Sequence, residues 1–307
     1  MALYLVTGGC GFIGSHLIDA LLAAGDEVRV LDDLSTGKLE NIPSQLELVR
    51  GDVADTDLVR GAMAGVDGCF HLAAIASVER GNQDWLGTHR TNLTGAITIF
   101  EEARRAKGGK KVPVVYASSA AVYGDNQEVP LSEASSVRPL SAYGADKLGC
   151  ELHARVAGQV HGVKTVGLRF FNVFGPRQDP KSPYSGVISI FCDRLRAGQG
   201  IAIHGDGQQT RDFVYVGDVV RALIAAMRVM PAGNPVFNVC TGRMISVLEL
   251  AKTAASLCGV EPKIDFQPAR SGDVRTSLGN PERLAEALGV RAETDFRTGL
   301  ARTLRLA

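Results

Sequence analysis

The sequence has no net charge, no long hydrophobic run and no closely spaced pair of cysteines. Its 33 basic and 33 acidic side chains cancel, so it offers no field that would attract a polyanion, and we expect no nucleic-acid partner. No apolar run reaches the roughly 18 residues of a membrane span, and the N-terminus lacks the basic start of a signal peptide. We therefore expect no membrane partner and a cytoplasmic location.

The six cysteines are widely separated, and no C-x-x-C pair occurs. This spacing argues against a zinc knuckle and against a redox dithiol, so we expect no metal site. Several cysteines lie in apolar or helical stretches, where a thiol behaves as a small hydrophobic group. Apolar residues make up 45% of the chain, and such a content with no net charge excludes disorder.

The first 170 residues alternate between apolar, β-rich runs and helical patterns. The runs lie at Leu3–Thr7, Val28–Asp32, Leu46–Arg50, Gly68–Leu72, Val112–Ala117 and Thr165–Arg169. The helical patterns lie at Ile13–Ala24, Asp55–Met63, Asp84–Ala106 and Ala142–Val160. Strands without polar alternation are buried on both faces, as in a parallel sheet covered by helices. The pattern predicts an α/β fold with a doubly wound parallel sheet.

The pattern changes after Phe171, where Gly, Pro and polar residues cluster at 175–186. The later segments predict three helical regions and two strands, at Val187–Gly198, Ile201–His204, Val247–Leu257, Lys263–Phe266 and beyond Asn280. A strand and helix at Phe213–Val229 are expected to return to the main sheet. We therefore predict a main domain of residues 1–170, joined by 212–236, and a smaller α/β lobe made of 171–211 and 237–307.

A glycine-rich turn, T-G-G-C-G-F-I-G, joins the first strand to the first helix. Gly8 permits a tight turn, Gly11 lets the backbone approach a pyrophosphate, and Gly14 lets helix and strand pack closely. The helix N-terminus then offers unpaired N–H groups to the phosphates. The alternative, a glycine turn that only packs, is disfavoured by the strand before it, the helix after it, and the acidic end of the second strand.

That acidic residue, Asp32, lies 18 residues beyond Gly14, where a carboxylate accepts hydrogen bonds from an adenosine ribose. A carboxylate at this point repels a 2′-phosphate, and no arginine follows within residues 33–37. The sequence therefore predicts NAD, rather than NADP, as the cofactor.

Three further residues have the order and spacing of a catalytic group. Tyr143 and Lys147 are four residues apart, which places phenol and ammonium on one helical face. Ser118 and Ser119 end the fifth strand, where a ligand crevice is expected. A surface lysine and a capping serine are the structural alternatives. The order of these residues behind a dinucleotide turn favours Ser119, Tyr143 and Lys147 as catalytic residues.

Together these motifs resemble the extended short-chain dehydrogenase/reductase superfamily, whose main domain is a Rossmann fold. The other segments that carry the resemblance are Gly51-Asp52-Val53, His71-Leu72-Ala73-Ala74, Asn92 and Ser118–Gly124. Within this superfamily, Leu168–Arg177 and Gln209–Val216 look like UDP-glucose 4-epimerase and its close nucleotide-sugar relatives. The resemblance covers nearly the whole chain.

The resemblance implies which residues bind NAD. Asp52 and Val53 would hold the adenine, and Leu72, Ala73 and Ala74 would line the dinucleotide path. The full expected set is Gly8, Gly11, Phe12, Ile13, Gly14, Asp32, Asp33, Asp52, Val53, Leu72, Ala73, Ala74, Asn92, Tyr143, Lys147 and Phe170.

The resemblance also implies residues that bind a UDP-sugar. Asn172 would contact the diphosphate, and Arg211 and Arg270 would clamp it, because guanidinium forks match phosphate oxygens. The alternative for the arginines is a solvated surface position. Asp273 would accept a hydrogen bond from the uridine ribose, and Ser277 would leave room for an N-acetyl group on the sugar C2. The full expected set is Ser119, Asn172, Val187, Ala202, His204, Arg211, Arg270, Asp273 and Ser277.

The implied reaction is C4 epimerisation of a UDP-hexose through a transient 4-keto sugar. Tyr143 would take the proton of the 4-hydroxyl while Ser119 hydrogen-bonds the same oxygen. Related 4,6-dehydratases carry an Asp-Glu pair where this chain has Ala120 and Ala121, which disfavours dehydration. One group of uronic-acid epimerases carries a cation where this chain has Asp179, and we expect an anion there to favour a neutral hexose.

Other reactions of the superfamily stay open: a uronic-acid epimerase, a 4,6-dehydratase, a decarboxylase or a reductase. A non-catalytic NAD-binding regulator is a remote alternative, because such proteins typically lose the tyrosine or the lysine. Relatives pair as homodimers through the helices that match Asp84–Ala106 and Ala142–Val160, so we expect a homodimer. The apolar residues of these helices suit a face towards the sheet equally well.

Overall fold

The computed structural model describes residues 1–105, 110–179, 186–269 and 274–304. A seven-stranded sheet forms its centre, with the strand order β11-β6-β5-β4-β1-β2-β3. These strands are β1 (Leu3–Thr7), β2 (Glu27–Asp32), β3 (Glu47–Arg50), β4 (Gly68–His71), β5 (Val114–Ser119), β6 (Thr165–Phe170) and β11 (Val236–Val239). Every neighbouring pair is parallel. The predicted doubly wound sheet is therefore confirmed, and its order reverses between β1 and β4.

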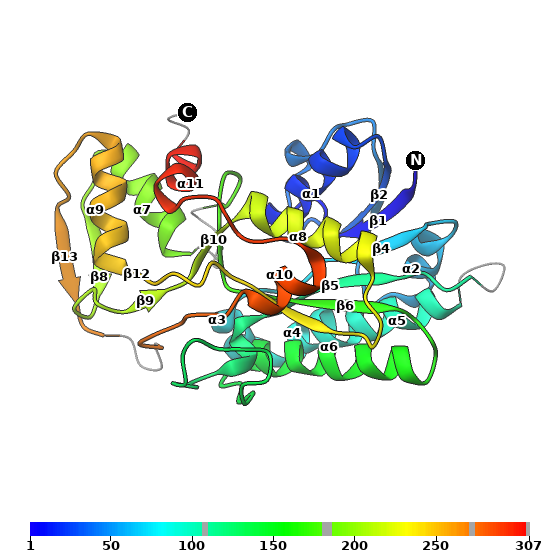
Figure 1. Cartoon of the computed structure of the whole chain (residues 1–307). Coiled ribbons are helices and arrows are strands. Elements are labelled where there is room, and N and C mark those ends of the chain that lie inside the picture. The colour runs from blue at the N-terminus through cyan, green and yellow to red at the C-terminus, as the bar shows by residue number, and fades with distance from the viewer. Residues whose placement is uncertain (106–109, 180–185, 270–273, 305–307) are drawn as a thin grey trace.

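Helices cover both faces of this sheet (Figure 1). One face packs against α1 (Phe12–Ala23) and α8 (Val216–Val229), the other against α2 (Thr56–Met63), α5 (Gly95–Arg104) and α6 (Ala142–Gln159). Alternate strand residues point to opposite faces. Val115 thus packs in the cluster that includes residues of α1 and α8, and Val114 packs in the cluster of α5 and α6. This two-sided burial explains why the strands are apolar without alternation.

The helix expected over 84–106 is present over residues 85–104, but it contains a π-helical turn, and a separate short helix precedes it. The preceding helix is α3 (Val78–Gln83), and the expected helix consists of α4 (Trp85–His89), the π-helical turn η2 (Arg90–Thr94) and α5 in direct succession. The side chains of Ser77 and Asp84 accept hydrogen bonds from backbone N–H groups and begin α3 and α4. The π-helical turn holds Asn92, whose amide bonds both the N–H and the C=O of Ile75. This turn therefore holds a side chain that bonds the loop after β4.

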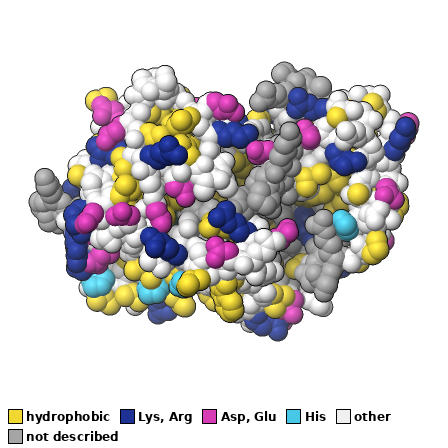
Figure 2. Space-filling model, turned by 180° about the vertical axis from the view of Figure 1, so that it is seen from behind, with side chains coloured by type: hydrophobic (Ala, Val, Ile, Leu, Met, Phe, Trp, Pro, Cys, Tyr) yellow, Lys and Arg dark blue, Asp and Glu magenta, His cyan; other side chains and the backbone are white. Residues whose placement is uncertain are grey.

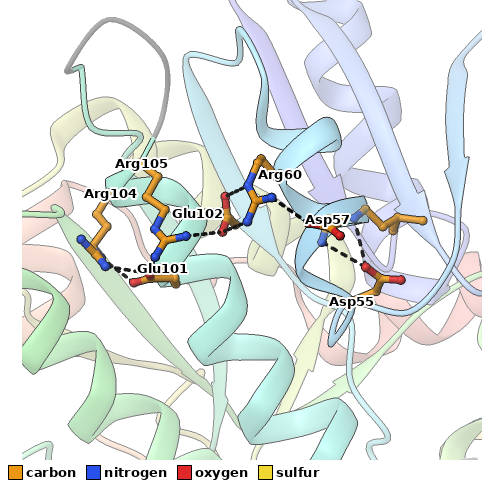
Figure 3. Close-up of polar contacts among 8 residues, drawn as sticks. Asp55, Asp57, Arg60, Glu101, Glu102, Arg104 and Arg105 are labelled. Carbon is orange, nitrogen blue, oxygen red and sulfur yellow. Dashed lines mark hydrogen bonds and ion pairs between the residues drawn. The ribbon is translucent and has the colours of Figure 1, made fainter.

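Ion pairs join α2 to α5 (Figure 3). Arg60 Nε donates to Glu102 Oε2 at 3.0 Å, and the Glu102 side chain is buried. Arg60 also pairs with Asp57 at 2.7 Å, while Asp55 caps α2 by accepting from the N–H groups of Asp57 and Leu58. A buried carboxylate requires such a partner. These bonds fix α2 against α5 on one face of the sheet.

A smaller lobe lies beside the sheet and has its own apolar cluster (Figure 1). Its main elements are α7 (Val187–Arg196), β8 (Ile201–His204), α9 (Val247–Cys258), β13 (Ile264–Gln267) and α11 (Phe296–Thr303). Strand β13 pairs with β8 in parallel. Two further strand pairs are β7 (Asn172–Phe174) with β10 (Phe213–Tyr215), and β9 (Thr210–Arg211) with β12 (Ile245–Ser246). The predicted smaller α/β lobe is thus present.

The chain passes between the two bodies more often than its sequence indicates. Of the segment expected to return to the main sheet, α8 packs there and Val214 of β10 joins the same apolar cluster, but β10 pairs with β7 rather than with a strand of the main sheet. The predicted boundary at residue 236 coincides with the start of β11, which is a strand of the main sheet. Helix α10 (Glu282–Leu288) also packs on the main body, through Leu284 and Leu288.

Three general features concern membrane spans, metal-ligand clusters and cysteines. In the described ranges, no helix is both long and apolar enough to pass through a bilayer. The same residues contain no group of three or more His, Cys, Asp or Glu side chains that suits a metal ion. All six cysteines are free thiols, and five of them are buried.

Candidate active site

A cavity of about 980 Å³ lies at the carboxyl ends of the strands. Its walls come from the glycine turn, the ends of β2, β4, β5 and β6, and residues of α7 and β8 in the lobe. In doubly wound sheets, ligands bind at this edge, where the strand order reverses. The cavity is therefore the candidate active site.

The glycine turn forms one end of this cavity. Gly8 has a φ of +68°, and a Cβ there would lie 2.7 Å from the backbone nitrogen of Ala73. A Cβ on Gly14 would lie 2.2 Å from the oxygen of Gly8, so neither position has space for a side chain. Among the described residues no side chain caps α1, and Phe12 and Ile13 at its start line the cavity. Free N–H groups at a helix start suit a pyrophosphate, so the turn fits NAD.

Asp32 lies beside the turn and is buried. Its Oδ2 accepts from the N–H of Cys10 at 2.9 Å, and its Oδ1 accepts from the N–H of Leu34 at 2.8 Å. Burial raises the pKa of this carboxyl, while the two backbone bonds oppose the rise. Each carboxylate oxygen has a second lone pair, so Asp32 can still accept from a ribose. The next acid, Asp33, also lines the cavity.

Tyr143 and Lys147 reach the cavity from the first two turns of α6. Ser141 begins this helix by accepting from the N–H of Gly144 at 3.1 Å. Lys147 is only 2% exposed, and its Nζ donates to the oxygen of Ala117 at 2.9 Å. The same Nζ lies 5.9 Å from the centre of the Tyr143 ring. The helix therefore presents a phenol and a buried ammonium together.

Ser119 reaches the cavity from the end of β5. Its Oγ accepts from the N–H of Ala121 at 3.1 Å, which begins the 3-10 turn η4 (Ala120–Tyr123). The Oγ keeps its own proton to donate. The three expected catalytic residues thus line one cavity, with the serine on a different element from the phenol and the ammonium.

A buried histidine supports the wall after β4. His71 is 3% exposed, and its Nδ1 lies 2.8 Å from Thr7 Oγ1. That hydroxyl oxygen already accepts from the N–H groups of Leu72 and Ala73, so its proton is free to donate to the histidine. Burial, with a smaller effect of nearby Lys147, lowers the pKa of His71 to about 3. The imidazole is therefore neutral and holds the backbone that lines the cavity.

Most of the residues expected at the site line this cavity. They are Gly8, Gly11, Phe12, Ile13, Gly14, Asp32, Asp33, Asp52, Val53, Leu72, Ala73, Ala74, Ser119, Tyr143, Lys147, Phe170, Asn172, Val187, Ala202, His204 and Arg211. Asn92 is different, because its buried amide bonds the backbone of Ile75, which lines the cavity in its place. Arg270 and Asp273 lie outside the described residues.

Ser277 lines a second, smaller recess of about 290 Å³. This recess shares five residues with the main cavity: Ser119, Phe170, Phe171, Asn172 and Arg211. Its other walls include Tyr123, Asn126, Leu131 and Thr276. The recess therefore opens beside the expected catalytic serine.

Two charged residues of the cavity wall are absent from the set of site residues predicted from the sequence. Lys38, from the loop after β2, and Asp179, from the loop after β7, line the cavity and form an ion pair at 2.9 Å. This pairing weakens the sequence argument that Asp179 repels an acidic sugar, because Lys38 compensates its charge. In the sequence, the signals that place these two residues near the site are the position of Lys38 shortly after Asp32 and Asp33, and that of Asp179 directly after the G-P-R-Q segment.

The loop that contains Asp179 is fixed on α1. His16 Nε2 lies 2.9 Å from the oxygen of Pro176, and Arg177 pairs with Asp19 at 2.7 Å. Residues 177–179 therefore connect the glycine-turn helix with the beginning of the lobe.

Comparison with known proteins identifies the family. Residues 4–240 match the model of the NAD dependent epimerase/dehydratase family. A UDP-glucose 4-epimerase of Mycolicibacterium smegmatis is 40% identical over 308 residues, which cover 98% of this chain and 96% of the relative.

Two solved structures show the same fold. The UDP-glucose 4-epimerase of Thermotoga maritima, solved with UDP-glucose, is 36% identical with a TM-score of 0.93, covering 99% of this chain and 97% of that one. The UDP-N-acetylglucosamine 4-epimerase of Methanobrevibacter ruminantium, solved with UDP-N-acetylmuramic acid, is 34% identical with a TM-score of 0.93 and the same coverage. With the cavity and its glycine turn, these matches show that the chain is an enzyme of the NAD dependent epimerase/dehydratase family.

Proposed function

We propose that this enzyme is an isomerase that inverts C4 of a UDP-hexose, with UDP-glucose and UDP-galactose as its substrate pair. The observation that carries the proposal is the arrangement of Ser119, Tyr143 and Lys147 on one cavity whose far end is a dinucleotide turn. The similarity to UDP-glucose 4-epimerases over nearly the full chain supports the choice of reaction.

The chain's own residues would move the proton of the sugar 4-hydroxyl. NAD, when bound, supplies the chemistry of accepting a hydride from C4 and returning it. Tyr143 takes the hydroxyl proton, and the ammonium of Lys147 stabilises the negative charge on the phenol oxygen. Ser119 Oγ donates to the same sugar oxygen and holds it towards Tyr143. When the hydride returns, Tyr143 gives the proton back.

Inversion requires that the sugar turn over while the nucleotide stays in place. Arg211 and Asn172 line both the main cavity and the recess, where they would hold the diphosphate. His204 lines the lobe side of the main cavity, and we place the uracil beside it. The 4-keto sugar would then present its opposite face to the hydride donor without leaving the cavity.

We also propose that the enzyme accepts UDP-GlcNAc and UDP-GalNAc. Ser277 is small, and the recess that it lines adjoins Ser119, so a C2 substituent has space there. A structurally similar epimerase from Methanobrevibacter ruminantium was solved with a UDP-N-acetyl sugar, which supports this extension.

Dehydration is disfavoured by the residues after Ser119. Ala120 and Ala121 occupy the start of η4 beside the recess, and neither side chain can donate or accept a proton. A 4,6-dehydratase needs such a group to remove water across C5 and C6. The family description includes dehydratases, and the identity of the product distinguishes the two reactions.

We propose a homodimer formed through α4 and α6. Large apolar side chains are exposed on these helices: Trp85, Leu86, Leu152 and Val156. Figure 2 shows hydrophobic side chains along the lower edge of the main body, where Figure 1 places α6. Light scattering should give twice the chain mass for the wild type and the single mass for Leu152→Asp. A monomeric wild type would refute the dimer.

The reaction is tested with a panel of UDP- and dTDP-sugars, followed by NMR of the anomeric protons and by nicotinamide absorbance. The proposal predicts interconversion of UDP-glucose and UDP-galactose with no net change in added NAD or NADH. A net oxidation or reduction would indicate a dehydrogenase or reductase, and a 4-keto-6-deoxy product would indicate a dehydratase. Tight NAD binding with no turnover of any sugar would indicate a regulator.

A further inference from the structure

A buried arginine connects the elements that hold the catalytic residues. Arg169 lies on β6 and is 5% exposed. Its guanidinium forms a two-pronged ion pair with Glu151, from Nε to Oε1 at 2.8 Å and from Nη2 to Oε2 at 2.7 Å. A buried ion pair adds little stability over apolar packing. The question is therefore which elements this pair and its neighbours hold together.

The ion pair joins α6 to β6, and further hydrogen bonds attach α6 to the end of β5. Glu151 lies one helical turn after Lys147, which lies one turn after Tyr143, so the three side chains form one stripe on α6. Ser118 Oγ donates to Glu151 Oε1 at 2.5 Å, and Lys147 Nζ donates to the oxygen of Ala117. The helix is thus bonded to two consecutive residues of β5, directly before Ser119.

The same guanidinium also holds the turn that follows Ser119. Arg169 Nη1 donates to the phenol oxygen of Tyr123 at 2.8 Å, and that phenol donates to Asn238 Oδ1 at 2.6 Å. Tyr123 is the last residue of η4, which Ser119 caps, and it is fully buried. Asn238 belongs to β11, beside β6, and its Nδ2 donates to the oxygen of Leu131 at 2.9 Å.

We infer that Arg169, Glu151 and Tyr123 are positioning residues that set the separation of Ser119 and Tyr143. The two catalytic groups come from different elements, and one guanidinium is bonded both to α6, which holds Tyr143, and to η4, the turn that Ser119 begins. Displacement of reacting groups by about 1 Å can cost on the order of 100-fold in rate. The inference rests on the proposed function, because it assigns the network a role in a reaction at Ser119 and Tyr143.

The test removes the hydroxyl of Tyr123 and keeps its buried ring in place. Tyr123→Phe keeps the ring but removes the acceptor for Arg169 and the donor to Asn238. We expect its kcat to fall by roughly tenfold, as a small displacement of the serine requires, with the Kd for UDP and the KM unchanged. The matched control is Tyr116→Phe, because Tyr116 is also buried on this sheet and its hydroxyl has no hydrogen-bond partner among the described residues.

A second variant tests the other connection. Ser118→Ala removes the bond between β5 and Glu151, so we expect kcat to fall without a change in KM. If both variants act through Glu151 and Arg169, the double variant should lose less than the product of the two single losses. If Tyr123→Phe gives no folded protein, the kcat and KM of Ser118→Ala decide the question.

The outcomes separate positioning from a structural role. A kcat for Tyr123→Phe within twofold of the control, even with a lowered Tm, would overturn the inference, as would a loss confined to KM. The wild type is measured beside them on the sugar panel. A wild type without C4 epimerisation would refute the proposed function and this inference together, whereas an active wild type with an equally active Tyr123→Phe would refute the inference alone.

Discussion

Acidification below about pH 6.5 should destabilise this protein through His71. The imidazole is buried and its pKa is lowered to about 3, whereas an unfolded histidine titrates near 6.5. Between these values the unfolded chain binds a proton that the folded chain does not, so stability falls as the pH falls. The free energy of unfolding is therefore undiminished by His71 well above pH 6.5, and it falls progressively as the pH drops from there towards 3.

The size of the effect follows from the two pKa values. A pH of 5 lies about 1.5 units below the pKa of the unfolded histidine, and each unit corresponds to about 1.4 kcal/mol of unfolding free energy. The free energy of unfolding should therefore fall by about 2 kcal/mol between pH 7.5 and pH 5 on account of this residue. That is a substantial part of the roughly 5–15 kcal/mol of a typical domain.

Urea unfolding at the two pH values measures this contribution against His71→Asn. Asparagine does not titrate here, and its amide can still accept from the hydroxyl of Thr7. Other groups, such as His16 with its lowered pKa, contribute equally to both proteins and cancel in the comparison. The wild type should lose about 2 kcal/mol more than the variant between the two pH values. Equal losses would refute the assignment of a buried, neutral His71.

Three further predictions concern the site. Tyr143→Phe should lower kcat by about 10²- to 10⁴-fold and leave UDP binding by calorimetry unchanged; near-normal turnover would refute its role as base. Lys38 and Asp179 join two loops of the cavity wall, so Lys38→Met should speed NAD release a few-fold, up to about fivefold at low salt, as followed by nicotinamide fluorescence, and Asp179→Asn should give the same rate. No acceleration in either variant would show that this pair does not retain the cofactor. Ser277→Tyr should abolish turnover of UDP-GlcNAc but retain that of UDP-glucose, and unchanged turnover of both would remove Ser277 from the C2 pocket.

The sequence predicted the sheet well, because its strands are buried on both faces. An uninterrupted apolar run such as Leu3–Thr7 has few alternatives, and β1 has those same bounds. The expected helix over 84–106 is found over residues 85–104, but helical periodicity does not reveal the π-helical turn within it. Ser77 was a visible capping signal for the helix that was missed, α3, whereas Asp84 caps the helix that was expected. Strand β11 was missed because it is short and follows a segment rich in proline and glycine.

The candidate site was predictable where its residues form local motifs. The glycine turn and the pair Tyr143 and Lys147 are set by spacing within one turn or one helix, so their common cavity could be anticipated. The pairs Arg169–Glu151 and Lys38–Asp179 could not, because their partners come from different elements and meet only in the folded chain. Such contacts need the tertiary structure, and they are the basis of the positioning network proposed above.

The central claim is that the enzyme removes a hydride from C4 and returns it to the same carbon. It is tested most directly with UDP-glucose that carries deuterium at C4, incubated in ordinary water. The account predicts UDP-galactose that retains the deuterium at C4, formed with no uptake of solvent hydrogen at that carbon. Galactose with hydrogen from solvent at C4, or a labelled sugar recovered without any inversion, would contradict it.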